Sequence, residues 1–432
     1  MTQLEAAGAG RVTREMTAVA AAEGVPVELV REELAAGRAV VLANPGHAGV
    51  RPVGVGRRFC TKVNANLGRS PEQSEAGGEL RKLRVALDAG ADVVMDLSVG
   101  PDLCAIRQAL LSASPVPLGT VPVYEAVSRL SDDLPVLDTD LLMTVIREQA
   151  EQGVDFMTLH AGLLRRHVPA ALGRIMGIVS RGGAIMAEWM SVHQKENPLF
   201  ERWDEVLAIC RKHDVTVSLG DGLRPGCLAD AGDAAQFGEL EVLGDLVRRC
   251  RKAGVQVMVE GPGHVPFNQI RDQMEREQTV CDGAPFYVLG PVVTDIAPGY
   301  DHITSAIGAT AAACYGASLL CYVTPAEHLG LPNEAEVHQG VIAHRIAAHA
   351  GDVARGLPGA RSRDDAISRA RVALDWEGQF ALAIDGRHAR ERYLQTRTCA
   401  PEDADHCSMC GRAFCAIRTT RRIREHHPHP TA

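Results

Sequence analysis

Three cysteines near the C-terminus, Cys407, Cys410 and Cys415, form a C-x2-C-x4-C pattern. Three thiolates on one short loop can hold three irons of a 4Fe–4S cluster and leave the fourth iron open to a small molecule. Zinc is the alternative, but a structural zinc ion takes four protein ligands, so His406 or Cys399 would have to complete the set. The pattern therefore predicts a metal centre and favours an iron–sulfur cluster over zinc.

Carboxylates and imidazoles recur at or near the ends of short apolar runs in the middle of the chain. Burying so many polar groups without partners is costly, whereas convergence on one polar ligand or metal satisfies them together. Each residue alone can equally be a satisfied loop residue or a helix N-cap. As a set they predict an active site at one end of a layer of strands. The residues are Asp96, His160, Glu188, Asp221, Glu260, Asp295, Asp301 and Glu327.

Two histidines and two arginines suggest more specific roles. His264 and His328 each follow an apolar run, and two imidazoles with water or substrate would make an open zinc-type site, although a lone histidine is more often a hydrogen-bonded core or loop residue. Arg224, in Gly-Leu-Arg-Pro, and Arg181, in Ser-Arg-Gly-Gly, are candidates for phosphate binding, because a guanidinium offers paired donors beside a glycine-rich turn. The alternative for both arginines is an ordinary tight turn with a surface side chain.

Eight short apolar runs, rich in Val, Ile, Leu or Met, are the elements that could position these side chains. Such runs, closed by Gly, Pro or a polar residue, are typical of parallel strands buried on both faces. Amphipathic helical patterns lie between several of them, so the alternation predicts an α/β protein with a (β/α)8 TIM-type barrel. The runs are 91–98, 116–122, 154–162, 183–190, 215–222, 255–261, 284–296 and 317–325, and the helical patterns are Arg14–Glu23, Val27–Ala36, Leu80–Ala89, Leu141–Glu151, Trp203–Lys212 and Phe237–Lys252.

A doubly wound open sheet is the main structural alternative. No G-x-G-x-x-G motif follows the first predicted strand, which disfavours the dinucleotide-binding form of that fold. Two regions flank the predicted barrel, one with a Gly/Pro/Arg-rich connector and one that is Ala-rich and helical in pattern. The predicted domains are an N-terminal extension at 1–75, the barrel at 76–333, a helical region at 334–395 and a cluster-binding tail at 396–432.

The composition excludes several classes of protein. The 432-residue chain has 46% hydrophobic and 23% charged residues, as is usual in globular proteins. Its net charge of −9 and its aromatic content of 4% argue against a general nucleic-acid binder. No apolar run reaches the ~18 residues of a membrane span, and no secretory signal is evident at the N-terminus. Twelve cysteines without an export signal predict a reducing, cytoplasmic location.

Long motifs are spread over most of the chain. They include Ser-Leu-Gly-Asp-Gly-Leu-Arg-Pro-Gly at 218–226, Glu-Gly-Pro-Gly-His-Val-Pro at 260–266 and Thr-Asp-Ile-Ala-Pro-Gly-Tyr-Asp-His at 294–302. Further motifs lie at 62–68, 95–98, 119–124 and 320–332, and in the Cys-Ser-Met-Cys-Gly tail. Together they resemble the phosphomethylpyrimidine synthase family of thiamine biosynthesis, from about residue 10 to residue 420.

The resemblance implies a radical S-adenosylmethionine (SAM) enzyme that rearranges 5-aminoimidazole ribotide to 4-amino-5-hydroxymethyl-2-methylpyrimidine phosphate and releases formate and carbon monoxide. It implies that Cys407, Cys410 and Cys415 bind a 4Fe–4S cluster whose open iron takes SAM. It also implies that His264 and His328 bind zinc, or iron or cobalt in its place. A homodimer and an electron donor such as flavodoxin or ferredoxin are implied as partners. The implied substrate contacts are Asn66, Met95, Tyr124, His160, Ser180, Arg181, Gly182, Asp221, Gly222, Leu223, Arg224, Glu260 and Tyr287.

The product is left open by two departures from the family pattern. The loop at 42–47 reads differently from the usual Asn-rich stretch, and Gly411-Arg-Ala-Phe stands where Gly-Pro-Lys-Phe is common. A close paralogue group makes 5-hydroxybenzimidazole from the same substrate, and this is the second hypothesis. A third is a zinc-dependent barrel aldolase or hydrolase whose cysteine tail is a zinc knuckle.

Overall fold

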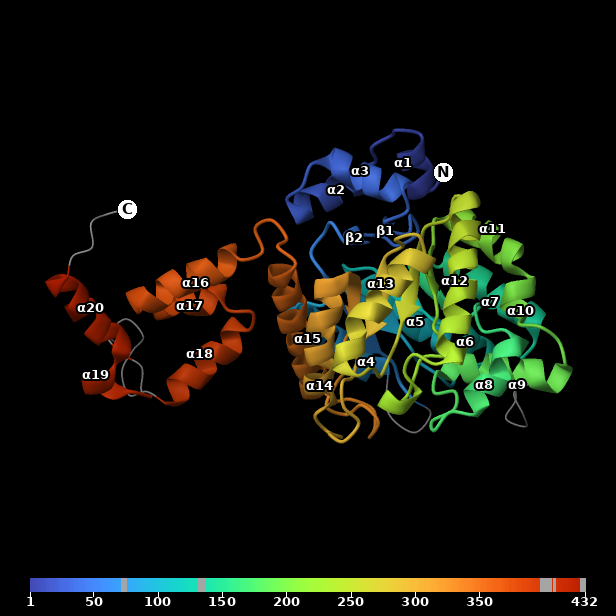
Figure 1. Ribbon diagram of the computed structural model, residues 1–432. Helices are drawn as coiled ribbons and strands as arrows, with labels where there is room; N and C mark the ends of the chain where they lie inside the picture. The colour runs from blue at the N-terminus through green and yellow to red at the C-terminus, as the bar shows by residue number, and fades with distance from the viewer. Residues whose placement is uncertain (71–75, 131–136, 397–405, 407–408, 428–432) are drawn as a thin grey trace. The chain divides into compact units, whose positions relative to one another are not determined.

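The computed structural model describes residues 1–70, 76–130, 137–396, 406 and 409–427. The chain divides into two compact units, Met1–Leu357 and Pro358–Ala432 (Figure 1). The first unit contains all the strands that the structure describes, and the second is made of helices joined by loops. None of the described helices combines the length and the apolar character that a membrane crossing needs.

Eight parallel strands of the first unit form a closed barrel. They are β3 Lys62–Leu67, β4 Val93–Asp96, β5 Leu118–Thr120, β6 Phe156–Leu159, β7 Thr216–Leu219, β8 Val257–Gly261, β9 Phe286–Leu289 and β10 Ala317–Cys321. Their order around the barrel is β10-β3-β4-β5-β6-β7-β8-β9. Nearly every strand residue is buried, because side chains alternately fill the interior and pack under the surrounding helices. The predicted TIM-type fold is therefore confirmed.

Helices connect the strands and cover the outside of the barrel (Figure 1). They are α4 Ala76–Ala89, α5 Leu103–Ala113, α6 Pro122–Ser128, α7 Thr139–Glu151, α8 Val168–Leu172, α9 Arg181–His193, α10 Pro198–Glu201, α11 Trp203–His213, α12 Ala234–Lys252, α13 Ile270–Val280, α14 Asp301–Tyr315 and α15 Glu334–Ala354, with 3-10 turns at Arg165–His167, Leu228–Asp230 and Phe267–Gln269. Helix α12 is typical: the Asp233 side chain caps its first turn, and Val242, Leu243, Leu246 and Val247 bury one face. The predicted helical patterns in this region coincide with α4, α7, α11 and α12.

One predicted strand is a helix, and one strand has no signal in the sequence pattern. The run 183–190 lies in α9, where the Ser180 hydroxyl accepts a hydrogen bond from the Gly183 N–H and caps the first turn. A short apolar run is compatible with a buried helix as well as with a strand, and here the Ser180 cap favours the helix. Glu188, predicted at a strand end, is consequently exposed on this helix. The barrel strand that the apolar runs did not predict is β3. Asparagines interrupt its apolar pattern, and it lies before residue 76, where the barrel was predicted to begin.

The N-terminal residues close the barrel at the end where its strands begin. These elements are α1 Gln3–Gly8, α2 Arg14–Glu23, α3 Val27–Ala35 and the antiparallel strands β1 Ala39–Leu42 and β2 Val53–Gly56. Helices α1–α3 pack with β1 around a small core of their own above the barrel (Figure 1). The Asn44 N–H donates to Asp155 just before β6, and the Gln256 side chain pairs with the Val41 backbone just before β8.

The second unit begins at Pro358 and is helical. Its elements are α16 Ser362–Ala373, α17 Trp376–Leu382, α18 Gly386–Gln395, α19 Gly411–Phe414 and α20 Ala416–His426. Trp376 and Phe380 contact Tyr393 with ring centres 4.4 and 5.5 Å apart, so the three rings form an aromatic cluster in this unit. Cys410 and Cys415 flank α19, whereas Cys407 lies outside the described residues. The division of the chain into four domains stays a prediction.

Candidate active site

A polar cavity opens at the ends of the barrel strands where the sequence predicts the active site. The volume that the centre of a water-sized molecule can occupy in this cavity is about 80 Å³. Every barrel strand, or the segment that follows it, contributes to the lining, so the side chains converge as they do in other enzymes of this fold. Eight of the predicted substrate contacts line the cavity: Asn66, Met95, Tyr124, His160, Asp221, Arg224, Glu260 and Tyr287.

Strand register brings four of these distant residues into one layer. Asn66 of β3 pairs with Met95 of β4, and Glu260 of β8 pairs with Tyr287 of β9. The Tyr287 hydroxyl donates to the Met95 sulfur at 3.4 Å. The side chains of β4 and β9 therefore meet inside the barrel, which fixes the floor of the cavity.

Arg224 places a partly buried positive charge between two carboxyl groups. Its Nη2 lies 2.9 Å from Asp221 Oδ1 and 3.9 Å from Glu260 Oε2. Glu260 Oε1 also accepts hydrogen bonds from the hydroxyls of Thr158 and Ser218, at 2.6 and 2.8 Å. Burial raises the pKa of both carboxyl groups, and the Arg224 charge opposes this only in part. One guanidinium between two buried carboxyl groups leaves one of them able to hold a proton, as acid–base chemistry requires.

His160 offers the cavity an unsatisfied imidazole. Both ring nitrogens are buried, and neither has a hydrogen-bond partner in the described part of the chain. Burial, with the nearby Arg224 charge, lowers the pKa of His160 to about 3. The ring is therefore neutral near pH 7 and carries one N–H donor and one acceptor for a ligand. Since buried polar groups are rarely left unpaired, His160 is the clearest sign of a missing ligand.

The start of α9 lies beside the cavity wall. Ser180 caps the helix, and the guanidinium of Arg181 lies 4.8 Å from the centre of the Tyr124 ring. A Cβ built at Gly182 would approach the His160 ring to 2.4 Å, so only glycine allows the helix to come this close. Arg181 and Gly182 are thus placed next to lining residues, and the dipoles of the N–H groups in the first helical turn favour anions there.

The turn after β7 holds the two remaining predicted substrate contacts. The Leu223 N–H donates to Glu239 Oε2 at 2.7 Å, which ties the turn to α12. A Cβ at Gly183 would lie 2.2 Å from the Gly222 carbonyl oxygen, so α9 and this turn pack backbone against backbone. Gly222 and Leu223 therefore shape the site through their backbone, not as members of the cavity wall.

Six lining residues are not among the predicted substrate contacts: Leu97, Val121, Thr158, Gly261, Leu289 and Cys321. Thr158 lies two positions before His160, and Leu289 lies two positions after Tyr287. Because alternate residues of a strand point to the same side, this spacing in the sequence could have identified both. Cys321 is one of several cysteines scattered through the sequence. Its sulfur accepts a hydrogen bond from Asn66 Nδ2 at 3.0 Å, and burial raises the pKa of its thiol to about 11.

The structure brings His264 and His328 together, with ring centres 5.2 Å apart. Nδ1 of His264 lies 2.8 Å from Asp295 Oδ1, and Nδ1 of His328 lies 3.3 Å from Asp301 Oδ1. A carboxylate on one ring nitrogen leaves the other nitrogen for a metal, which is the usual arrangement behind histidine ligands. No group of three potential ligand side chains occurs among the residues described. The pair therefore fits a metal whose other ligands are water or substrate.

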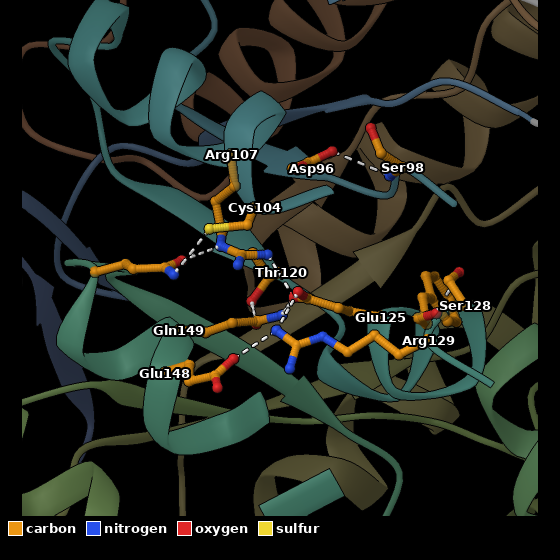
Figure 2. A network of polar contacts seen from close by, with 12 residues as sticks. Asp96, Ser98, Cys104, Arg107, Thr120, Glu125, Ser128, Arg129, Glu148 and Gln149 are labelled. Carbon is orange, nitrogen blue, oxygen red and sulfur yellow. Dashed lines mark hydrogen bonds and ion pairs between the residues drawn. The ribbon is translucent and has the colours of Figure 1, made fainter. Parts of the chain in front are cut away.

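A buried ion-pair network holds α6, the helix that carries Tyr124 (Figure 2). Glu125 accepts hydrogen bonds from Arg107 at 2.6 Å, from Arg129 at 2.7 Å and from Gln149 at 2.7 Å. These donors come from α5, from the end of α6 and from α7, so one carboxylate joins three elements. The network therefore fixes the position of the helix, and with it the aromatic wall of the cavity.

A family model described as the Radical SAM ThiC family matches residues 2–422. The chain belongs to this family. It is 58% identical over 428 residues to a phosphomethylpyrimidine synthase of Natronomonas pharaonis, with 98% of this chain and 89% of the relative covered. It is also 58% identical over 422 residues to a phosphomethylpyrimidine synthase of Haloarcula marismortui, with 97% and 87% covered. Among solved structures, the dihydropteroate synthase of Yersinia pestis has 14% identity and a TM-score of 0.43 over 73% of this chain and 98% of that one.

Membership confirms the family predicted from the motifs. The protein is a radical SAM enzyme, and the family brings with it SAM and a 4Fe–4S cluster. Its relatives are phosphomethylpyrimidine synthases, which places the family in thiamine biosynthesis.

Proposed function

We propose that the protein is a phosphomethylpyrimidine synthase that converts 5-aminoimidazole ribotide to 4-amino-5-hydroxymethyl-2-methylpyrimidine phosphate. Formate and carbon monoxide leave as the other products, and SAM becomes methionine and 5′-deoxyadenosine. The observation that carries the proposal is the convergence of eight predicted substrate contacts in one cavity at the mouth of the barrel. Relatives with that name and 58% identity over nearly the whole chain support it.

The cavity suits a phosphorylated, nitrogen-rich substrate. Arg181 and the N–H groups at the start of α9 offer cationic and neutral donors for a phosphate. His160 presents unsatisfied donor and acceptor positions to the aminoimidazole end, and Glu260 beside Arg224 can hold or release a proton there. When bound, SAM and the cluster would supply the radical chemistry that starts the reaction. The barrel walls exclude water and stray C–H bonds from that chemistry.

The cluster would be held by Cys407, Cys410 and Cys415, with SAM on its open iron. A reductant such as flavodoxin or ferredoxin would supply the electron, and the protein would act as a homodimer. Oxygen-sensitive chemistry and twelve cysteines suit a reducing cytoplasm. Replacing Cys410 by Ala should abolish SAM cleavage, whereas Cys314→Ala, a partly exposed thiol of α14, should leave it intact.

His264 and His328 would bind zinc, or iron or cobalt in its place. His264→Ala should lower the metal content of the purified protein. The loss of its Nδ1–Asp295 bond at 2.8 Å should lower the thermal unfolding midpoint only slightly, because the Asp295 side chain is partly exposed to water. His388→Ala, at an exposed position of α18, is the matched control. Full metal content in His264→Ala would refute the two-histidine site.

Mass analysis of the product tests the reaction itself. Anaerobic protein with a reconstituted cluster should release a pyrimidine phosphate from 5-aminoimidazole ribotide. A product with the mass of 5-hydroxybenzimidazole would assign the chain to the paralogous activity. A colourless, zinc-loaded protein that is catalytically active without SAM would contradict both radical activities, the one that makes the pyrimidine phosphate and the one that makes 5-hydroxybenzimidazole.

A further inference from the structure

A second cavity lies outside the barrel wall, between β8 and β9 and the helices α12 and α13, and both polar and apolar side chains line it. The volume that the centre of a water molecule can occupy in this cavity is about 30 Å³. A buried water needs ~10–15 Å³ on this measure, so the space holds about two. The two cavities share four lining residues, Asp221, Arg224, Glu260 and Gly261, and therefore meet at the ends of β7 and β8.

Helices α12 and α13 contribute three polar atoms to the lining of this cavity that lack hydrogen-bond partners among the described residues. Glu239 Oε1, Glu277 Oε1 and Gln273 Nε2 are buried, and none has a hydrogen-bond partner among the residues that the structure describes. Glu239 and Glu277 are only 2% and 0% exposed. Buried polar atoms are otherwise almost always satisfied, so their grouping in one cavity indicates water that bonds to them.

The hydrogen-bond chain along the top of this cavity fixes which atoms face it. The Gly232 N–H donates to Gln236 Oε1 at 2.7 Å, so the Gln236 amide must present its NH₂ group to Gln273. Gln236 Nε2 in turn donates to Gln273 Oε1 at 2.8 Å. Gln273 Nε2 is therefore left as a donor toward the cavity, where an acceptor such as a water oxygen satisfies it.

Burial raises the pKa of both glutamates, which favours their protonated forms. Burial raises the pKa of Glu239 to about 8, against the opposing N–H groups of the β7 turn and the charges of Arg224 and Arg174. Burial also raises the pKa of Glu277 well above its usual range, against Gln278, Arg57 and Arg251. Both carboxyl groups can therefore carry a proton and pass it on.

We propose that water in this cavity relays protons between Glu260 and Asp221 in the active site and Glu239 and Glu277 behind the barrel wall. Each transfer moves one proton from an oxygen to the next oxygen, and no electron moves. The outer end lies at Glu277, whose Oε2 accepts a hydrogen bond from the partly exposed Gln278. This inference rests on the proposed function, in which formic acid formed at the site ionises and its proton must leave.

Direct observation of the water tests the relay without any catalysis. A high-resolution crystal structure of the protein should show ordered water bonded to Glu239 Oε1, to Gln273 Nε2 or to Glu277 Oε1. Infrared spectra should show protonated carboxyl bands that shift in D₂O and that Glu239→Gln and Glu277→Gln each reduce. A dry cavity, or spectra unchanged by both substitutions, would overturn the proposal.

Turnover provides the second arm. In Glu277→Gln, product formation should slow by about tenfold or more and its solvent deuterium isotope effect should rise, while SAM and ribotide binding stay unchanged. Glu277→Asp should recover part of the rate, and Glu241→Gln, an exposed carboxylate of α12, should behave like wild type. Wild-type rate and isotope effect in Glu277→Gln would refute the relay. If the wild-type protein itself consumes no ribotide, the proposed function fails, and the crystallographic and infrared results still decide whether the cavity holds exchangeable protons.

Discussion

The buried pair between Arg107 and Glu125 supports a prediction in which the two partners are not equivalent. The Arg107 and Glu125 side chains are 2% and 5% exposed. Glu125 also has Arg129 and Gln149 as donors, whereas the other polar contact of Arg107 is its Nε bond to Gln152 at 2.6 Å. Glu125→Gln therefore strands a buried charge, and Arg107→Met does not.

The expected free energies follow from that difference. An uncompensated buried charge destabilises by about 3–5 kcal/mol, so this is the expected loss for Glu125→Gln. Arg107→Met removes the hydrogen bonds to Glu125 and Gln152 but also replaces a buried charge with an apolar side chain, so it should destabilise by about 1.5–3 kcal/mol. In the double variant no charge is stranded, so it should be more stable than Glu125→Gln alone.

Thermal unfolding measures these differences. The first unit spans Met1–Leu357, and unfolding entropies of ~2 cal/mol/K per residue give about 0.7 kcal/mol/K for a unit of this size. Glu125→Gln should then lower its unfolding midpoint by about 4–7 °C, and Arg107→Met by about 2–4 °C. The exposed pair Arg271–Glu275 is the control, since breaking it should shift the midpoint by less than about 1 °C. A double variant less stable than Glu125→Gln would refute the reasoning.

Three further substitutions test other contacts. Burial lowers the pKa of His47, but the hydrogen bond and charge of Asp155 outweigh this effect, so the pKa is raised overall. The pair therefore stabilises the folded protein below about pH 6.5, and this stabilisation is lost as the pH rises through the pKa of the folded state. His47→Gln should therefore lower the unfolding midpoint more at about pH 6 than at about pH 9, and an equal loss at both would contradict this. Gly182→Ala should weaken ribotide binding because its Cβ meets His160, and unchanged binding in calorimetry would argue against that approach. Asp295→Asn should reduce zinc affinity by about 10–100-fold in a metal-competition titration, and wild-type affinity would rule out its role.

Much of the barrel can be predicted from the sequence because most of its strands are short, mainly apolar runs. β4, β6 and β8 consist mostly of Val, Met, Leu and Phe, a composition typical of strands buried on both faces. Composition does not predict β3, because Asn64 and Asn66 face the polar interior of the barrel. There, Asn64 donates a hydrogen bond to the Tyr287 hydroxyl at 2.8 Å. The pairing of these residues depends on register between strands distant in the sequence, which no local pattern carries.

The candidate site divides in the same way. The motifs named Arg224 and Glu260 directly, but their shared ion pair and the unsatisfied ring of His160 emerge only when the strands close. Cys321 looked like one of several scattered buried thiols until the barrel placed it against Asn66. The glutamates behind the wall, on α12 and α13, resemble ordinary helix residues, and only packing against the barrel shows that they are buried.

The most direct test of the proposed function is the stoichiometry of the radical reaction. The protein, reconstituted with iron and sulfide under strict exclusion of oxygen, is given SAM, a reductant and 5-aminoimidazole ribotide, and 5′-deoxyadenosine and remaining ribotide are measured together. The proposed function predicts that 5′-deoxyadenosine rises as ribotide is consumed, in a constant ratio. Ribotide that persists at full cluster loading, or is consumed without 5′-deoxyadenosine, would contradict it.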